Sequence, residues 1–145
     1  MPQFEINFLA VGVAAIAHFV LGFLWYTPLF GRVWAKEMGF NADVKPPASL
    51  LARGMILGLV GNLLMAWVLS SNLGAWNPES WGQGPSQFSP TASAGMAALF
   101  TWLGFFLPVD LNTVAWEGRS WKGFAINTGY HFLSLLIVAL ILTSM

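Results

Sequence analysis

Two histidines, His18 and His131, are the side chains of this chain best suited to bind a ligand or transfer a proton. Each lies within a long apolar stretch, where a polar group is costly unless it faces other protein groups. Because imidazole is a common axial ligand of haem iron, the pair predicts a haem, chlorin or quinone site as one alternative. A path for protons or ions is a second alternative. Hydrogen bonds that fix helix packing are a third.

Other polar residues fall at a depth similar to that of the histidines. At about 1.5 Å per helical residue, His18, Asn62, Thr101 and His131 each lie roughly 12–17 Å from one end of their apolar stretch. Asn127 precedes His131 by one helical turn and shares its face. The sequence therefore predicts a polar layer that crosses several helices, made of His18, Asn62, Thr101, Asn127 and His131. Hydrogen bonds in such a layer contribute about 0.6–2 kcal/mol each.

A second polar group lies at the end of the third apolar stretch, the inner-rim cluster of Asp110, Asn112, Glu117 and Arg119. We expect Pro108 to bend the helix there and Asp110 to be hydrated close to the interface. An ion pair of Asp110 or Glu117 with Arg53 or Arg119 is also expected. The chain has no cysteine, phosphate loop, HExxH motif or nucleophile elbow, so we assign no catalytic residue and no metal site.

Four long apolar segments must position these residues. Of 145 residues, 57% are hydrophobic and 8% are charged, whereas soluble domains carry roughly 25% charged residues. A membrane-spanning helix needs about 20 mostly apolar residues. We predict an all-α integral membrane bundle of four transmembrane helices in a single domain, with spans at about residues 6–26, 54–71, 92–111 and 124–143.

All six Lys and Arg residues fall in two of the three connecting loops. The loop between the second and third spans has none, and cytoplasmic loops are the ones that carry an excess of basic residues. We therefore predict that both termini lie on the non-cytoplasmic side. The net charge of zero gives no footprint for nucleic acid, so the expected partners are the lipid bilayer and either a protein partner or a second copy.

The segment TPLFGRVWAKEMGF, which follows the first span, alternates apolar and charged residues. This pattern predicts a short interfacial helix after span one. The chain is also tryptophan-rich, and most of the eight Trp are expected to anchor the helices at the interfaces. Two stretches share the same order of features: Leu-Gly-Phe, then Pro, then Trp beside charged residues, then Gly-Phe. They are LGFLWYTPLFGRVWAKEMGF and LGFFLPVDLNTVAWEGRSWKGF, and the recurrence suggests an internal repeat.

Two stretches resemble a known family: GFLWYTPLFGRVWAKEMG and WLGFFLPVDLNTVAWEGRSWKGFAINTGYHFLSLLIVALIL. The chain resembles small four-span bacterial membrane proteins that form domain of unknown function 1761. The matching blocks are Trp25-Tyr26 with Pro28, Gly31 with Trp34, the Glu117-Gly118-Arg119 turn, and Asn127 to His131. The resemblance implies a four-helix domain in a bacterial inner membrane. It implies no activity, so it gives no catalytic residue.

These features favour a non-enzymatic, multi-pass protein of a bacterial inner membrane that acts by association. It would work as a homo-oligomer or as a small accessory subunit of a larger membrane complex, because small and aromatic residues suit helix packing. One alternative is a small oligomeric transporter or channel built around the polar layer. The other is a haem-, chlorin- or quinone-binding subunit that uses His18 and His131.

Overall fold

The computed structural model describes residues 1–145. They form helices joined by connecting segments, and they form no strands. The all-α prediction is therefore confirmed. In chain order the elements are α1 (Phe8–Leu24), the π-helical segment η1 (Trp25–Leu29), α2 (Gly31–Met38), α3 (Ala48–Trp76), the 3-10 turn η2 (Pro78–Trp81), α4 (Pro90–Thr101), the π-helical segment η3 (Trp102–Phe106), α5 (Leu107–Glu117) and α6 (Trp121–Ser144).

Four continuous helical segments are long and apolar enough to cross a membrane. They are Phe8–Leu29, Ala48–Trp76, Pro90–Glu117 and Trp121–Ser144, and each predicted span overlaps one of them. By the length and composition of these helices, the chain is a multi-pass membrane protein. The third segment runs six residues past the predicted end at residue 111, because the polar residues there continue the helix as α5 instead of ending it.

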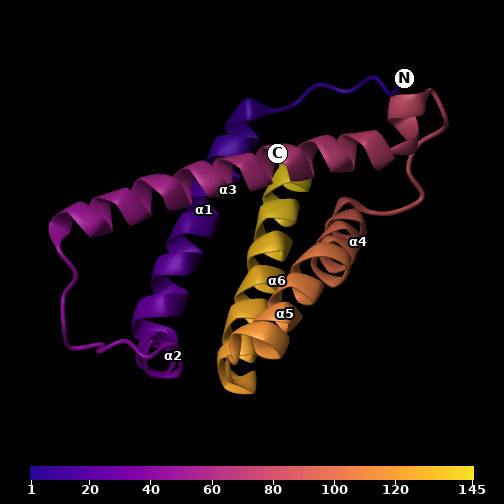
Figure 1. The fold of residues 1–145 in the computed structure, drawn as a ribbon. Helices are drawn as coiled ribbons and strands as arrows, with labels where there is room; N and C mark the ends of the chain where they lie inside the picture. Colours follow the sequence, from indigo (N-terminus) through magenta and orange to yellow (C-terminus); the bar gives the residue numbers. More distant parts are fainter.

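Helix α6 lies between α1 on one side and α4 with α5 on the other (Figure 1). The core between these helices is made largely of small residues, which let the helix backbones approach closely. From α6, Leu135, Val138 and Ala139 are fully buried. Ala14 of α1 and Ala98 of α4 are also fully buried against this core.

Helix α3 lies across the other helices instead of running beside them (Figure 1). Only 11% of its most apolar stretch is buried, compared with 33% for α6. All of residues 48–61 are exposed, and this half of α3 extends beyond α1. Apolar residues surround the whole circumference of α3, so no single face directs it into a regular four-helix bundle. Its 29 residues give a length of about 43 Å at 1.5 Å per residue.

At the end of the molecule that holds α2, the connection between α5 and α6 is short and capped. Helix α2 forms where a short helix was predicted after span one, and its Ala35 is buried. Glu37 of α2 accepts a hydrogen bond from the Ser120 hydroxyl, and Ser120 also caps the first turn of α6. Gly118 ends α5 with φ of 66°, a left-handed conformation that glycine adopts without strain.

The two termini both lie at the opposite end, which we call the termini end (Figure 1). The backbone N–H of Gln3 donates to the carbonyl of Ser80 in η2 at 2.7 Å. The ring of Phe4 lies against Gly74 so closely that a Cβ there would come within 2.5 Å of it. Glycine at position 74 therefore allows the N-terminal segment to pack on the end of α3. Whether this end faces away from the cytoplasm stays a prediction.

Candidate functional site

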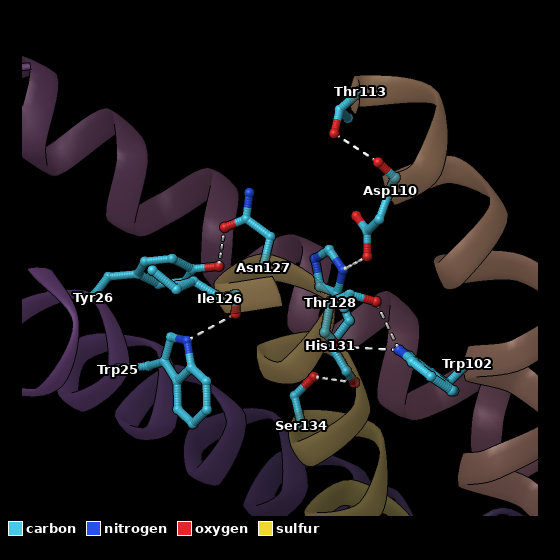
Figure 2. A network of polar contacts seen from close by, with 10 residues as sticks. All are labelled: Trp25, Tyr26, Trp102, Asp110, Thr113, Ile126, Asn127, Thr128, His131 and Ser134. Carbon is cyan, nitrogen blue, oxygen red and sulfur yellow. Dashed lines mark hydrogen bonds and ion pairs between the residues drawn. The ribbon is translucent and has the colours of Figure 1, made fainter. Parts of the chain in front are cut away.

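A carboxylate and an imidazole meet inside the helical region. His131 Nδ1 of α6 lies 2.8 Å from Asp110 Oδ2 of α5, and the two side chains point toward one another in Figure 2. The Asp110 side chain is 9% exposed and that of His131 is 29% exposed. The expectation that Asp110 is hydrated is therefore wrong, and the expected ion pair with an arginine is formed by Glu117 and Arg119 instead of by Asp110. Because α5 continues to Glu117, Asp110 lies about 10 Å inside the helix end, beyond easy reach of solvent.

The environment of this pair explains why the two groups need one another. An ionisable residue inside a membrane costs several kcal/mol unless it is paired. Phe106 covers His131 with ring centroids 5.0 Å apart, and the Ser134 hydroxyl donates to the His131 backbone carbonyl. The Thr113 hydroxyl donates to the backbone carbonyl of Asp110 at 2.6 Å. Carboxylate and imidazole together can hold or pass a proton, which is the chemistry that this site offers.

Asn127 takes part in a second contact, one helical turn before His131. The Tyr26 hydroxyl, from η1, donates to Asn127 Oδ1 at 2.9 Å. The Tyr26 ring also packs edge-on against Tyr130 and Trp34, with centroid distances of 5.0 Å and 5.1 Å. Asn127 therefore joins α6 to the end of α1 through a tyrosine that the predicted polar layer did not include.

His18 and Asn62 form a third contact, between α1 and α3. The hydrogen-bond network assigns the Asn62 amide so that its nitrogen donates to His18 Nδ1 at 3.1 Å and to Gly58 O at 3.2 Å. Its oxygen then accepts from Phe19 N. In this arrangement the proton of a neutral His18 lies on Nε2. His18 is buried and lies 5.6 Å from the ring of Tyr130.

The structure brings together four of the five residues predicted to form the polar layer. We call His18, Tyr26, Asn62, Asp110, Asn127, Tyr130 and His131 the polar cluster. Thr101 is the exception, because it lines a groove at the termini end instead.

The residues predicted to form the inner-rim cluster do not lie together either. Asp110 is buried with His131, whereas Glu117 pairs with Arg119 at 3.7 Å and Asn112 is exposed.

Two tryptophans that sequence reasoning assigned to membrane interfaces hold the centre of the site. Trp25 Nε1 donates to the Ile126 carbonyl at 3.0 Å, and Trp102 Nε1 donates to the Thr128 carbonyl at 3.0 Å. Figure 2 shows them approaching α6 from opposite sides. Each tryptophan begins a π-helical segment, η1 or η3.

We predict that Trp25→Phe and Trp102→Phe each lower the free energy of unfolding by about 1 kcal/mol, because each removes one interhelical hydrogen bond and little apolar surface. The measurement is unfolding in mixed detergent micelles. Trp116→Phe is the matched control, since Trp116 is 85% exposed. Equal effects at all three positions would contradict the assigned role of the indole N–H groups.

Gly22 allows Tyr130 to lie against α1. A Cβ at position 22 would come within 2.9 Å of the Tyr130 hydroxyl, whereas a Cβ at Gly12 on the same helix meets nothing within 4 Å. We expect Gly22→Ala to destabilise the protein by about 1–3 kcal/mol through overpacking. In a Tyr130→Phe background the cost should fall, since the clashing oxygen is gone. Gly12→Ala, as control, should not destabilise.

The same geometry bears on cofactor binding. The Tyr130 ring contacts both imidazoles, with centroids 5.6 Å from His18 and 5.7 Å from His131. One nitrogen of each histidine is already engaged, by Asn62 and Asp110 respectively. No group of three or more His, Cys, Asp or Glu side chains is placed to hold a metal ion. A histidine that binds a metal usually makes such a contact with its other ring nitrogen, so cofactor binding by His18 and His131 stays a prediction.

Comparison with known proteins gives one match. The family model described as protein of unknown function (DUF1761) matches residues 9–143, which is nearly the whole chain. No curated protein and no solved structure matches the chain.

Proposed function

The chain belongs to the DUF1761 family, and we propose that it is a non-enzymatic membrane protein that acts by association with further copies of itself. The observation that carries this proposal is the exposure of residues 48–61 of α3. Every residue in this half of α3, which includes the start of the predicted span 54–71, is exposed. A second copy is the occupant that we propose for it.

A stripe of small residues marks the surface of α3 that would form the contact. Gly54, Gly58 and Gly61 each have no atom within 4 Å of an added Cβ. The stripe continues toward Asn62, four residues after Gly58, where α3 packs on α1 through His18. Small residues at this spacing let two helices approach closely, and the same stripe on two copies is self-complementary. Lipid chains can pack against the exposed Leu and Ile side chains, but they make few contacts with a stripe of glycines that has no side chains.

The charge pattern supports an orientation for this assembly. The basic residues Arg32 and Lys36 lie on α2, and Lys122 lies in the first turn of α6, at the end opposite the termini. We propose that this end faces the cytoplasm of a bacterial cell and that α2 lies in the inner interface. The termini and the loop between α3 and α4, which has no Lys or Arg, would then face outward.

A structural role for the polar cluster fits a non-enzymatic function. Its polar groups find partners within the chain, through Asp110 with His131, Tyr26 with Asn127, and Asn62 with His18. Internally satisfied polar groups fix which helices pack together and in which register. The cluster would thereby hold α1, α5 and α6 as one rigid unit beside the exposed half of α3.

Counting copies in the membrane tests the proposal directly. Labelled protein, extracted into lipid nanodiscs without detergent, is counted by stepwise photobleaching. We expect two or more copies in most discs at low expression. A single copy in nearly all discs would overturn self-association. A single copy that co-purifies with an unrelated protein in constant ratio would instead identify this chain as an accessory subunit of another complex. That result would also overturn self-association.

A second candidate function rests on one different observation, the Asp110–His131 pair. A buried acid beside an imidazole is an arrangement that proton-coupled membrane proteins use. We propose proton or cation movement as the alternative. The test is the decay of a pH gradient across liposomes that contain the protein. Faster decay that Asp110→Asn abolishes, with folding retained, would favour this alternative, and decay equal to that of empty liposomes would reject it.

A further inference from the structure

A groove lies at the termini end, and none of the residues of the polar cluster line it. It encloses about 1010 Å³ between the ends of α3 and α4. Leu142 and Thr143 of α6 contribute to its lining, and the N-terminal segment closes one side with Phe4 and Glu5. Its volume is at the upper end of the range for small-molecule sites.

The lining of the groove changes in polarity along its length. Toward the middle of the molecule it is mostly apolar, with Leu69 on α3, Met96 and Phe100 on α4, and Phe105 on η3, and Ser70, Ser93 and Thr101 also line this part. Phe100 and Phe105 are 66% and 71% exposed, so nothing in the chain covers them. Toward the termini the lining becomes polar. The polar end includes Asn72, Asn77, Glu79, Ser80 and Ser86. An apolar trough with one polar end fits an amphiphile whose chain lies along α4.

The charges at the polar end define the headgroup that would fit. Glu5 and Glu79 are the only charged residues among those that line the groove. All six Lys and Arg residues lie in other parts of the sequence. Phe4, Trp76 and Phe88 also reach this end, and aromatic faces attract ammonium groups. A cationic ammonium is therefore favoured here, and a purely anionic headgroup is disfavoured.

From this geometry we infer that the groove binds one membrane lipid whose headgroup carries an ammonium, such as phosphatidylethanolamine. Its acyl chain packs against Phe100 and Phe105, and its ammonium lies between the carboxylates of Glu5 and Glu79. The Asn and Ser groups at the same end supply donors for the phosphate. This site is independent of self-association through α3, since its residues lie at the other end of that helix.

Native mass spectrometry of the purified full chain tests the inference. The probes are phosphatidylethanolamine and phosphatidylglycerol with identical acyl chains, titrated separately into detergent solution. We expect one phosphatidylethanolamine to bind at least five-fold more tightly than phosphatidylglycerol. Glycerophosphoethanolamine, the same headgroup without chains, should not displace it. Equal binding of the two lipids, or displacement by the headgroup alone, would overturn the assignment.

Variants separate the site from ordinary lipid contacts. In Glu5→Gln/Glu79→Gln the preference between the two lipids should fall to near one, while the acyl chain still binds. Ala97→Trp should fill the apolar part of the groove and reduce the bound fraction of both lipids. Glu117→Gln, at the opposite end of the molecule, is the matched control and should keep the full preference. If Glu5→Gln/Glu79→Gln keeps the wild-type preference, the carboxylates do not select the headgroup and the inference fails. Thermal unfolding confirms that each variant is folded.

Discussion

His131→Leu should lower the free energy of unfolding by about 3 kcal/mol, the largest effect expected of any single substitution in this chain. The substitution leaves Asp110 without its partner at 2.8 Å, in a position where the carboxylate is only 9% exposed. An unpaired carboxylate near the middle of a membrane helix costs about 2.5–3.5 kcal/mol. The measurement is reversible unfolding in mixed micelles, where both wild type and variant are soluble.

The double variant separates the loss of the Asp110–His131 contact from the loss of packing. Asp110→Leu/His131→Leu replaces both partners by apolar groups, and replacing a whole buried pair is often nearly neutral. We therefore expect Asp110→Leu/His131→Leu to be more stable than His131→Leu alone by about 2 kcal/mol. Additive costs of the two single substitutions would show that Asp110 and His131 do not depend on one another.

Gly54→Ile/Gly58→Ile should weaken self-association at least ten-fold, which corresponds to about 1.4 kcal/mol. The added side chains hold two α3 helices apart along the stripe where close approach is required. Because a Cβ at either position meets nothing within the chain, the fold of the single copy should be unchanged. Energy transfer between labelled copies in liposomes, measured against protein density, gives the dissociation constant.

Gly95→Ile is the matched control for this experiment. Gly95 lies on α4, in a membrane segment of similar apolar character, and its Cβ also meets nothing within 4 Å. It should leave association unchanged. Equal losses at Gly95 and at the Gly54/Gly58 pair would indicate a general effect of bulky residues and would contradict a specific α3 contact.

The apolar segments could be predicted from the sequence because membrane burial imposes a simple length rule. The end of the third segment could not. The polar residues after Leu111 suggested an interface, but α5 continues to Glu117 and thereby buries Asp110. Helical hydrogen bonds continue through polar residues when the helix packs on a neighbour, and α5 packs on α6 here. The position of one carboxylate therefore depended on tertiary contacts.

The expected depth of each polar residue could be counted along the sequence, but the direction in which each one faces could not always be predicted. Asn127 and His131 share a face by their spacing, and both take part in the polar cluster. Thr101 was predicted at the same depth but faces the groove at the termini end. The π-helical segment η3 begins directly after it, and a π-helix changes the rotation per residue. Counting 3.6 residues per turn through such a segment gives the wrong face.

Tryptophan roles were predictable for exposed positions and not for buried ones. Trp76 and Trp116 are 86% and 85% exposed, as residues at an interface would be. Trp25 and Trp102 are partly buried and donate to α6. An indole N–H satisfies a headgroup or a carbonyl equally well, so composition alone cannot separate the two roles. The crossing angle of α3 was also beyond prediction, because its apolar residues define no single buried face.

A cysteine scan along residues 51–61 tests the central claim, that a second copy covers the exposed half of α3, most directly. The chain has no native cysteine, so each single-cysteine variant reports one position. Oxidation in native membranes should cross-link copies most at Gly54, Gly58 and Gly61 and least at Ile56, on the opposite face of the helix. Cross-linking that is uniform around the helix, or absent at all positions while the protein remains folded, would contradict the account.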